Sequence, residues 1–175
     1  MTGAAYTPAQ KALHWLVAAL VAGLVAAGLV MTNLGDGDLK NGIYELHKSF
    51  GLVVLAALLP RAVLRALRGA PPPVPMPAWQ RLASRVSHGL LYALAVLVPV
   101  LGWAGTSACC APVTWFGVLP LTLPIGGGMD TGAAILGVHR VLALTLAALA
   151  TLHAAAALHH HFIRRDATLR RMLPN

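Results

Sequence analysis

The sequence predicts an all-α integral membrane protein, a four-transmembrane-helix bundle with both termini in the cytoplasm. The 175 residues are 58% hydrophobic and only 10% charged, whereas a soluble domain has about 25% charged residues. Four apolar stretches are each long enough to cross a bilayer, which takes about 20 residues. Lys and Arg side chains are concentrated on one side of these stretches. Residues 1–175 are therefore expected to form a single integral membrane domain.

The four spans follow one another with short breaks. They are predicted at residues 12–31, 43–67, 82–106 and 133–158. The first ends before a polar segment rich in glycine and aspartate. The second ends at a glycine and a run of three prolines, which cannot continue a helix. The third contains Pro99, where a kink is expected.

The connection 107–132 is long and apolar, but several prolines and three consecutive glycines interrupt it. Such a broken segment cannot satisfy its backbone as a span, so we expect it to lie as a cap on the membrane face. It contains the adjacent cysteines Cys109 and Cys110, which could be bridged only with strain. No C-x-x-C-H sequence indicates covalent haem attachment. No role is assigned to these cysteines.

Positive charge predicts the orientation, because cytoplasmic loops carry the excess of Lys and Arg. The loop after the second span and the C-terminal tail are rich in arginine, whereas the opposite, outer side has three basic and four acidic side chains. Both termini are therefore expected in the cytoplasm. The net charge of +8 mainly reflects this topology, and the basic side chains are also expected to contact lipid headgroups. No basic motif with interleaved aromatic residues indicates a nucleic-acid partner.

Two histidines of the fourth span, His139 and His153, indicate a functional site inside the membrane. They are fourteen residues apart, which places them within about 40° of one helix face and about 21 Å apart along the axis. Ionisable groups inside a membrane are costly and are usually functional. Two haem irons bound one above the other would need such a pair as axial ligands. The alternative is two side chains that hydrogen-bond to neighbouring helices.

Other histidines are predicted at the same two depths. His47, near the outer end of the second span, is level with His139. At the inner level, His153 faces either His14 of the first span or His88 of the third, and the spacing leaves this choice open. A haem with two imidazole ligands requires two rings that face each other at one depth. Both levels provide this arrangement on helices that a short-loop bundle makes neighbours.

Arg61 and Arg65 lie four residues apart on one face of the second span, after Pro60. One interpretation is that their side chains extend to the inner lipid headgroups. The other is that they pair with haem propionates, for which the planar guanidinium is well suited. The sequence favours neither.

Several short motifs are spread over nearly the whole chain. They are Leu-His-Trp-Leu at 13–16, His47, the two arginines before the proline-rich loop, His88 with Leu-Tyr at 91–92, Val-Pro-Val-Leu-Gly at 98–102, Leu-His-Ala-Ala-Ala-Ala-Leu at 152–158, His160 and His161, Asp166, Thr-Leu at 168–169, and Arg-Met-Leu-Pro at 171–174. With these motifs the sequence resembles bacterial cytochrome b561, of the type that includes the membrane-bound superoxide oxidase. The C-terminal match is the most specific.

The resemblance implies two b haems enclosed by the bundle, which connect the outer face to ubiquinone near the inner face. Carried over residue by residue, His14 and His153 would ligate the inner haem, and His47 and His139 the outer one. His160 matches a position associated with quinone binding. The expected location is the bacterial inner membrane, with lipid as the surrounding partner.

The resemblance also implies a superoxide:ubiquinone oxidoreductase. Superoxide is an anion, and a positive outer surface would attract it, but the outer loops of this chain are slightly acidic. Lys48 and Arg140, each next to a proposed ligand, are expected to form a local positive patch there. With His160 as a proton donor, for which His88 is the alternative, they are the expected catalytic residues.

Two other functions fit the same residues. The first is a haem b membrane anchor that relays electrons for a partner dehydrogenase or hydrogenase. The second is a non-haem membrane protein whose histidines bind metal or pack. A haem spectrum separates the second from the others, and activity of the isolated protein separates the first from an autonomous oxidoreductase.

Overall fold

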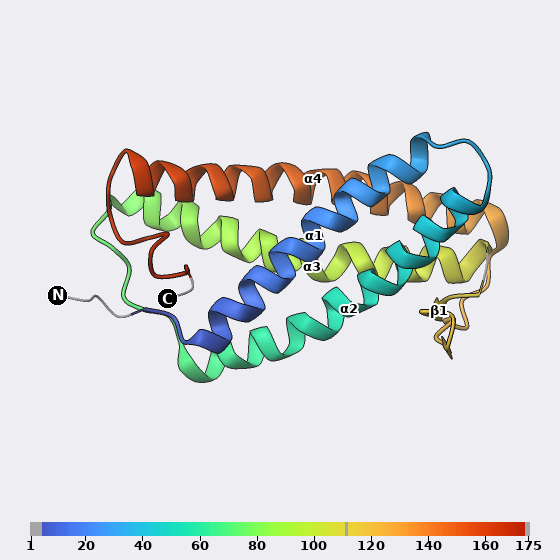
Figure 1. Ribbon diagram of the computed structural model, residues 1–175, viewed down its shortest axis with the longest axis horizontal. Coiled ribbons are helices and arrows are strands. Elements are labelled where there is room, and N and C mark those ends of the chain that lie inside the picture. Colours follow the sequence, from blue (N-terminus) through green and yellow to red (C-terminus); the bar gives the residue numbers. More distant parts are fainter. Residues whose placement is uncertain (1–4, 111, 174–175) are drawn as a thin grey trace.

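A computed structural model describes residues 5–110 and 112–173. Its elements are the helices α1 (Pro8–Asn33), α2 (Asp38–Arg68), α3 (Ala78–Cys109) and α4 (Gly128–Phe162), and the short strands β1 (Thr114–Trp115) and β2 (Leu119–Pro120). The helices run side by side, so that α1 begins and α4 ends at the same end of the bundle (Figure 1). All four are long and apolar enough to cross a membrane. The predicted fold class, an all-α four-span bundle, is confirmed.

Each helix extends a few residues beyond the stretch predicted from its apolar residues. Hydropathy marks the part of a helix that crosses hydrocarbon, whereas the helix continues into the interface until a local signal ends it. α1 begins with a capping box: the Gln10 backbone N–H donates to the Thr7 hydroxyl, and the Gln10 side chain accepts from the Thr7 backbone. Gly69 follows the last residue of α2 and caps it, with a φ of 67° that favours glycine. α3 continues through Pro99.

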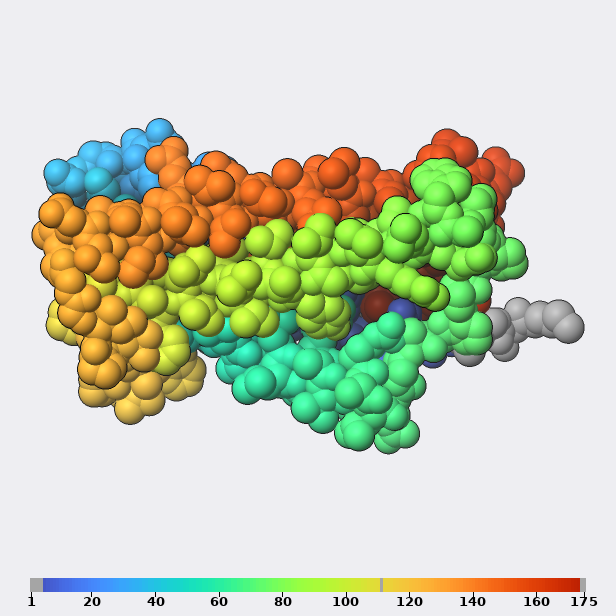
Figure 2. Space-filling model, turned by 180° about the vertical axis from the view of Figure 1, so that it is seen from behind, coloured from blue at the N-terminus to red at the C-terminus, as the bar shows by residue number. Residues whose placement is uncertain are grey.

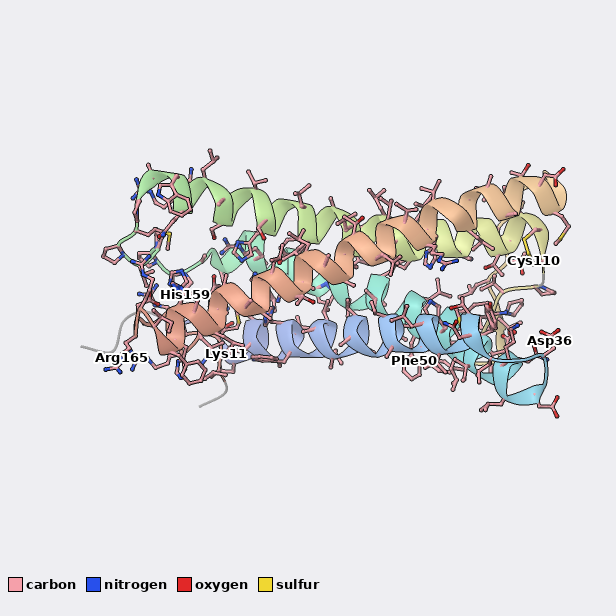
Figure 3. The ribbon with its side chains drawn as sticks, turned by 90° about the horizontal axis from the view of Figure 1, so that it is seen from above. Lys11, Asp36, Phe50, Cys110, His159 and Arg165 are labelled. Atoms are coloured by element: carbon pink, nitrogen blue, oxygen red, sulfur yellow. A yellow bond between two sulfur atoms is a disulfide. The ribbon has the colours of Figure 1, made fainter. Side chains whose placement is uncertain are left out.

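Charged residues separate between the two ends of the bundle. Lys11, His159 and Arg165 lie at the end where α1 begins, and Asp36 lies at the opposite end with Cys110 (Figure 3). We call these the inner and outer ends, after the orientation expected from the sequence. The acidic loop after α1 is thus far from the arginine-rich tail, as the charge pattern predicts.

The helices pack mainly as two pairs, α1 with α2 and α3 with α4. A small apolar cluster joins the pairs near mid-bundle, where Val54 and Leu58 of α2 meet Ala95 of α3. Many large hydrophobic side chains on all four helices remain exposed, as expected for surfaces that face lipid. Figure 2 shows a hollow between α2 and α3 toward the inner end, in which atoms of α1 and of the C-terminal segment are visible.

The connection after α3 forms a hairpin, in which β1 pairs antiparallel with β2. Ser49 of α2 attaches it to the bundle: its hydroxyl accepts from the Phe116 backbone N–H at 2.9 Å and donates to the Thr114 carbonyl at 3.5 Å. The segment therefore folds against the outer end of α2, and the prediction that it is not a span is confirmed. At the end of α3 the sulfur atoms of Cys109 and Cys110 form a disulfide.

The segment after α4 returns to the beginning of α1. The Trp15 indole donates to the Met172 carbonyl at 2.9 Å. Arg171 donates to the Pro72 carbonyl at 2.6 Å, and Arg164 to the Gln80 side chain at 2.6 Å. These bonds hold the tail beneath the inner end of the bundle.

Candidate functional site

The outer histidines come from two helices and face each other. The ring centroids of His47 on α2 and His139 on α4 are 6.2 Å apart. Nδ1 of His139 lies 2.8 Å from the Val98 carbonyl oxygen. Because a carbonyl oxygen only accepts, Nδ1 holds the proton and Nε2 keeps its lone pair, which is the tautomer that binds a metal through Nε2. The His47 ring lies near the Leu24 backbone of α1, but its buried Nδ1 makes no hydrogen bond of normal geometry.

Glycines stand against both outer rings. A Cβ at Gly102 would lie 3.0 Å from Cε1 of His139, and a Cβ at Gly28 would lie 3.5 Å from Cε1 of His47. All four helices line a cavity of about 120 Å³ around the pair, with Met31 from α1. The backbone is thus kept close to the rings by residues without a side chain, as expected where a flat ligand lies between helices.

Three histidines meet at the inner level. His14 of α1 lies 6.4 Å from His153 of α4, and His88 of α3 lies 5.2 Å from His153, measured between ring centroids. Nδ1 of His88 lies 2.7 Å from the Ser84 carbonyl oxygen of its own helix. Within the described residues, no group of three or more His, Cys, Asp or Glu side chains is arranged to hold a metal ion.

The centroid distances test whether a metal-centred macrocycle fits. Imidazole–metal bonds are about 2 Å long. Two such bonds, plus the distance from each nitrogen to its ring centre, separate the centroids by roughly 6 Å. The 6.2 Å of His47 and His139 and the 6.4 Å of His14 and His153 match this separation. The 5.2 Å between His88 and His153 is short for it, so the geometry fits His14 better than His88.

The two levels are connected along α4. Leu146 lies seven residues from His139 and seven from His153, and it is only 5% exposed. It packs with Leu94 and Val98 of α3. Seven residues are almost two turns, so Leu146 lies on the same face of α4 as both histidines. A close-packed apolar layer therefore separates the outer and inner levels.

Arg61 belongs to the inner level. Its Nη2 lies 3.1 Å from Nδ1 of His14, and its guanidinium lies over the Tyr92 ring, 5.4 Å from the centroid. Since arginine only donates, Nδ1 of His14 accepts and the ring proton is on Nε2. Arg65, one turn further along α2, is exposed.

His160 lies seven residues after His153, almost on the same face of α4. Its Nδ1 is 2.6 Å from Oδ2 of Asp166 and 3.3 Å from the Thr168 hydroxyl. Burial raises the pKa of the Asp166 carboxyl, but hydrogen bonds from Thr168 and His160 outweigh it and lower the pKa to about 2. The carboxylate is thus ionised at neutral pH, so Nδ1 of His160 donates to it.

The outer basic residues are arranged differently from one another. Lys48 lines the outer cavity, and its Nζ lies 2.6 Å from Oε1 of Glu45. Lys40 is paired with Asp36 at 2.9 Å. Arg140 is exposed and does not line the cavity. Of the two residues expected to form a positive patch, the structure therefore brings only Lys48 to the histidine pair.

Two partners of the site were not predicted from the sequence. Glu45 lies three residues before Lys48 on a helix, and this spacing could have indicated the ion pair. Asp166 lies beyond the end of α4, where no helical spacing relates it to His160.

Comparison with known proteins decides the family. The family model described as prokaryotic cytochrome b561 matches residues 5–175. The chain belongs to the prokaryotic cytochrome b561 family. It is therefore a multi-pass bacterial membrane protein that transfers electrons with haem b, and the resemblance noted in the sequence is confirmed.

The chain aligns with nearly the whole length of its relatives in the cytochrome b561 family. Cytochrome b561 homolog 2 of Escherichia coli (strain K12) is 38% identical, over 96% of this chain and 90% of the relative. Cytochrome b561 homolog 1 of the same organism is 31% identical, over 97% of each chain. The protein named probable superoxide oxidase CybB of Yersinia pestis is 27% identical, over 97% of this chain and 96% of the relative.

Proposed function

We propose that this protein transfers single electrons through two b haems, from superoxide at the outer, periplasmic face of the inner membrane to ubiquinone near the inner face. The observation that carries the proposal is the similar spacing of two histidine pairs, 6.2 Å and 6.4 Å between ring centroids, at two levels of one bundle. Bound haem supplies a one-electron couple between ferric and ferrous iron. Two superoxide anions, two protons and one quinone would yield two dioxygen molecules and one quinol.

The proposed ligands are His47 and His139 for the outer haem and His14 and His153 for the inner one. The Nδ1 proton of His139, held on the Val98 carbonyl, leaves Nε2 available as a ligand atom. His47 has a buried Nδ1 that makes no hydrogen bond of normal geometry, beside a cavity lined by Gly51 and Gly102.

At the inner level, the ring proton of His14 has to change nitrogens before Nε2 could bind a haem iron. In the structure Arg61 donates to Nδ1, which leaves the proton on Nε2. Ligation through Nε2 requires this proton to move to Nδ1, and Arg61 must then release the ring. Its guanidinium would then be free to pair with a propionate, and Arg65, four residues later on the same face of α2, would be a second candidate for this role. Both arginines are therefore proposed to bind the inner haem.

Reduction of a quinone to a quinol also requires protons. Asp166 holds the Nδ1 proton of His160 through the 2.6 Å hydrogen bond. This leaves Nε2 as the nitrogen that exchanges a proton with a quinone oxygen, and the carboxylate stabilises the charged imidazolium. His160 is about 10 Å along α4 from the proposed ligand His153, so a quinone at His160 would lie close to the inner haem.

The electron donor is proposed to enter beside Lys48, which lines the cavity of the outer pair. Arg140 contributes only at longer range, because it lies outside the cavity lining. Superoxide as the donor is supported by the name of the relative from Yersinia pestis.

The test uses the purified protein alone. Pyridine haemochrome assay should give two b haems per chain, and superoxide should drive ubiquinone reduction without a partner protein. His160→Ala should slow this reaction, and His159→Ala is its matched control, since His159 is an exposed neighbour of His160. If the purified protein contains haem but does not reduce ubiquinone with superoxide, the autonomous reaction is wrong. A membrane anchor that serves a partner dehydrogenase or hydrogenase would then be favoured. One haem or none would overturn the ligand assignment.

A further inference from the structure

Lys48, which lines the cavity of the outer histidine pair, is held in an ion pair. Nζ of Lys48 lies 2.6 Å from Oε1 of Glu45, one helical turn earlier on α2. The Lys48 side chain is 11% exposed and that of Glu45 is 55% exposed. Lys48 lines the cavity together with His47, whereas Glu45 lines the adjoining cleft between α2 and the hairpin, at Phe116. Lys48 thus presents no free positive charge to the cavity.

The rest of the outer end does not replace that charge. Lys40 is paired with Asp36. Arg140 has no hydrogen bond or ion pair within the described part of the chain, but it does not line the cavity. Asp38 and Asp130 lie in the first turns of α2 and α4 and add negative charge at the same end. The entrance is therefore nearly neutral.

We propose that Glu45 is a specificity-determining residue for the electron donor: by neutralising Lys48, it removes the preference that the outer cavity would otherwise have for anionic donors. This inference rests on the proposed function, because it takes the outer pair as the point of electron entry. An anionic donor such as superoxide would form no bond here; it would give up one electron, which a haem held by the outer pair would accept, and leave as dioxygen.

The physical basis is the short range of charge effects in salt. A single charge acts on an approaching ion over about one Debye length, roughly 8 Å at physiological ionic strength. The carboxylate of Glu45 touches Lys48, the one Lys or Arg side chain among the described residues that line the cavity. Removal of this carboxylate therefore changes the local potential at the entrance in a way that distant acidic residues do not.

The test compares two isosteric substitutions on one helix. Glu45→Gln removes the charge and retains the shape, and i, i+3 pairs of this kind contribute little to stability. Asp38→Asn is the matched control. Asp38 lies seven residues earlier on nearly the same face of α2, about 10 Å farther from the histidine pair.

The first measurement is stopped-flow reduction of the haem by donors of opposite charge. In Glu45→Gln at low salt, superoxide should reduce the haem about two- to five-fold faster and hexaammineruthenium(II) should reduce it more slowly. High salt should remove both effects, and Asp38→Asn should show much smaller ones. If both donors change in the same direction, or neither changes, Glu45 does not act through its charge and the inference is wrong.

The second measurement does not involve haem. Lys48 is labelled with anionic trinitrobenzenesulfonate or with neutral fluorodinitrobenzene, and the product is quantified by peptide mass spectrometry. Glu45→Gln should raise the ratio of anionic to neutral labelling, and an unchanged ratio would overturn the inference. A wild-type protein that neither donor reduces would instead disprove the proposed function, while the labelling ratio would still test Glu45.

Discussion

Arg61 donates a hydrogen bond from Nη2 to Nδ1 of His14, 3.1 Å away. The bond joins the two helices of the first pair, α1 and α2, at the level of the inner histidines. It also determines the ring tautomer, because arginine cannot accept. The same guanidinium lies over Tyr92 of α3. Arg61 thus contacts two other helices within the proposed inner haem site, whereas Arg65 is exposed.

Arg61→Ala should lower the reduction potential of the inner haem. Loss of a nearby positive charge disfavours the more negative, reduced state. We expect a decrease of roughly 30–60 mV, equivalent to about 1 kcal/mol. Spectroscopic redox titration measures it. Arg65→Ala is the control and should shift the potential less; an equal shift in both variants would show that general charge, and not the site geometry, is responsible.

The histidine pairs should be separable by substitution. His47→Ala or His139→Ala should remove one haem signal, and His14→Ala or His153→Ala the other, because each pair shares one depth. Low-temperature absorption spectra and haem content of each purified variant provide the measurement. His88→Ala should retain both haems. If it removes the inner signal while His14→Ala retains it, the third helix supplies the ligand.

Gly102→Val should disrupt the outer level. Even the first carbon of a side chain there would lie 3.0 Å from the His139 ring, and overpacking of this kind costs about 1–3 kcal/mol. The outer haem should bind weakly or be lost, with the inner haem retained, as measured by haem content. Gly89→Val is a control on the same helix, since a Cβ at Gly89 meets no atom within 4 Å. Full outer occupancy in Gly102→Val would contradict the assigned position of the macrocycle.

Docking of the C-terminal segment should weaken in acid. The folded-state pKa of Asp166 is lowered to about 2 from its ordinary value of 3.8 by hydrogen bonds from Thr168 and His160, which outweigh burial. A carboxyl with a depressed pKa contributes stability that is fully present above the unfolded pKa and is lost as pH falls through the folded pKa. Acid-active protease should therefore cleave the tail increasingly between about pH 4 and pH 2. Asp166→Asn should be cleaved readily throughout and lose this pH dependence; a wild-type profile in that variant would mean that the Asp166 charge does not hold the tail.

Asp166→Asn should also slow quinone reduction at neutral pH. The amide retains a hydrogen-bonding group for His160 but cannot stabilise the imidazolium, so we expect a loss of about ten- to a hundred-fold in kcat with KM nearly unchanged. Steady-state kinetics at several quinone concentrations measure both constants. Asp130→Asn, an acidic residue at the outer end, should behave as wild type. A rise in KM alone would indicate that Asp166 acts only in quinone binding.

The sequence alone determined the four spans, because apolar length and the breaks at proline and glycine are local properties. It also placed His139 and His153 on one face of one helix, since helical periodicity is a local rule. The shared depth of His47 and His139 followed from the span boundaries. The few residues by which each helix exceeded its prediction depended on caps such as Thr7 with Gln10, which hydropathy does not register.

Only the tertiary structure decided which groups meet across helices. By depth alone, His14 and His88 are equally good candidates for the second inner ligand. The packing of α1 and α3 against α4 places the His14 ring centroid 6.4 Å, and the His88 ring centroid 5.2 Å, from that of His153. The contact between His160 and Asp166 depends on how the chain turns after α4, which no periodicity describes. Lys48 and Arg140 each follow a proposed ligand by one residue. Yet Lys48 lines the cavity and Arg140 does not, because the rotation of each helix about its axis is set by packing with its neighbours.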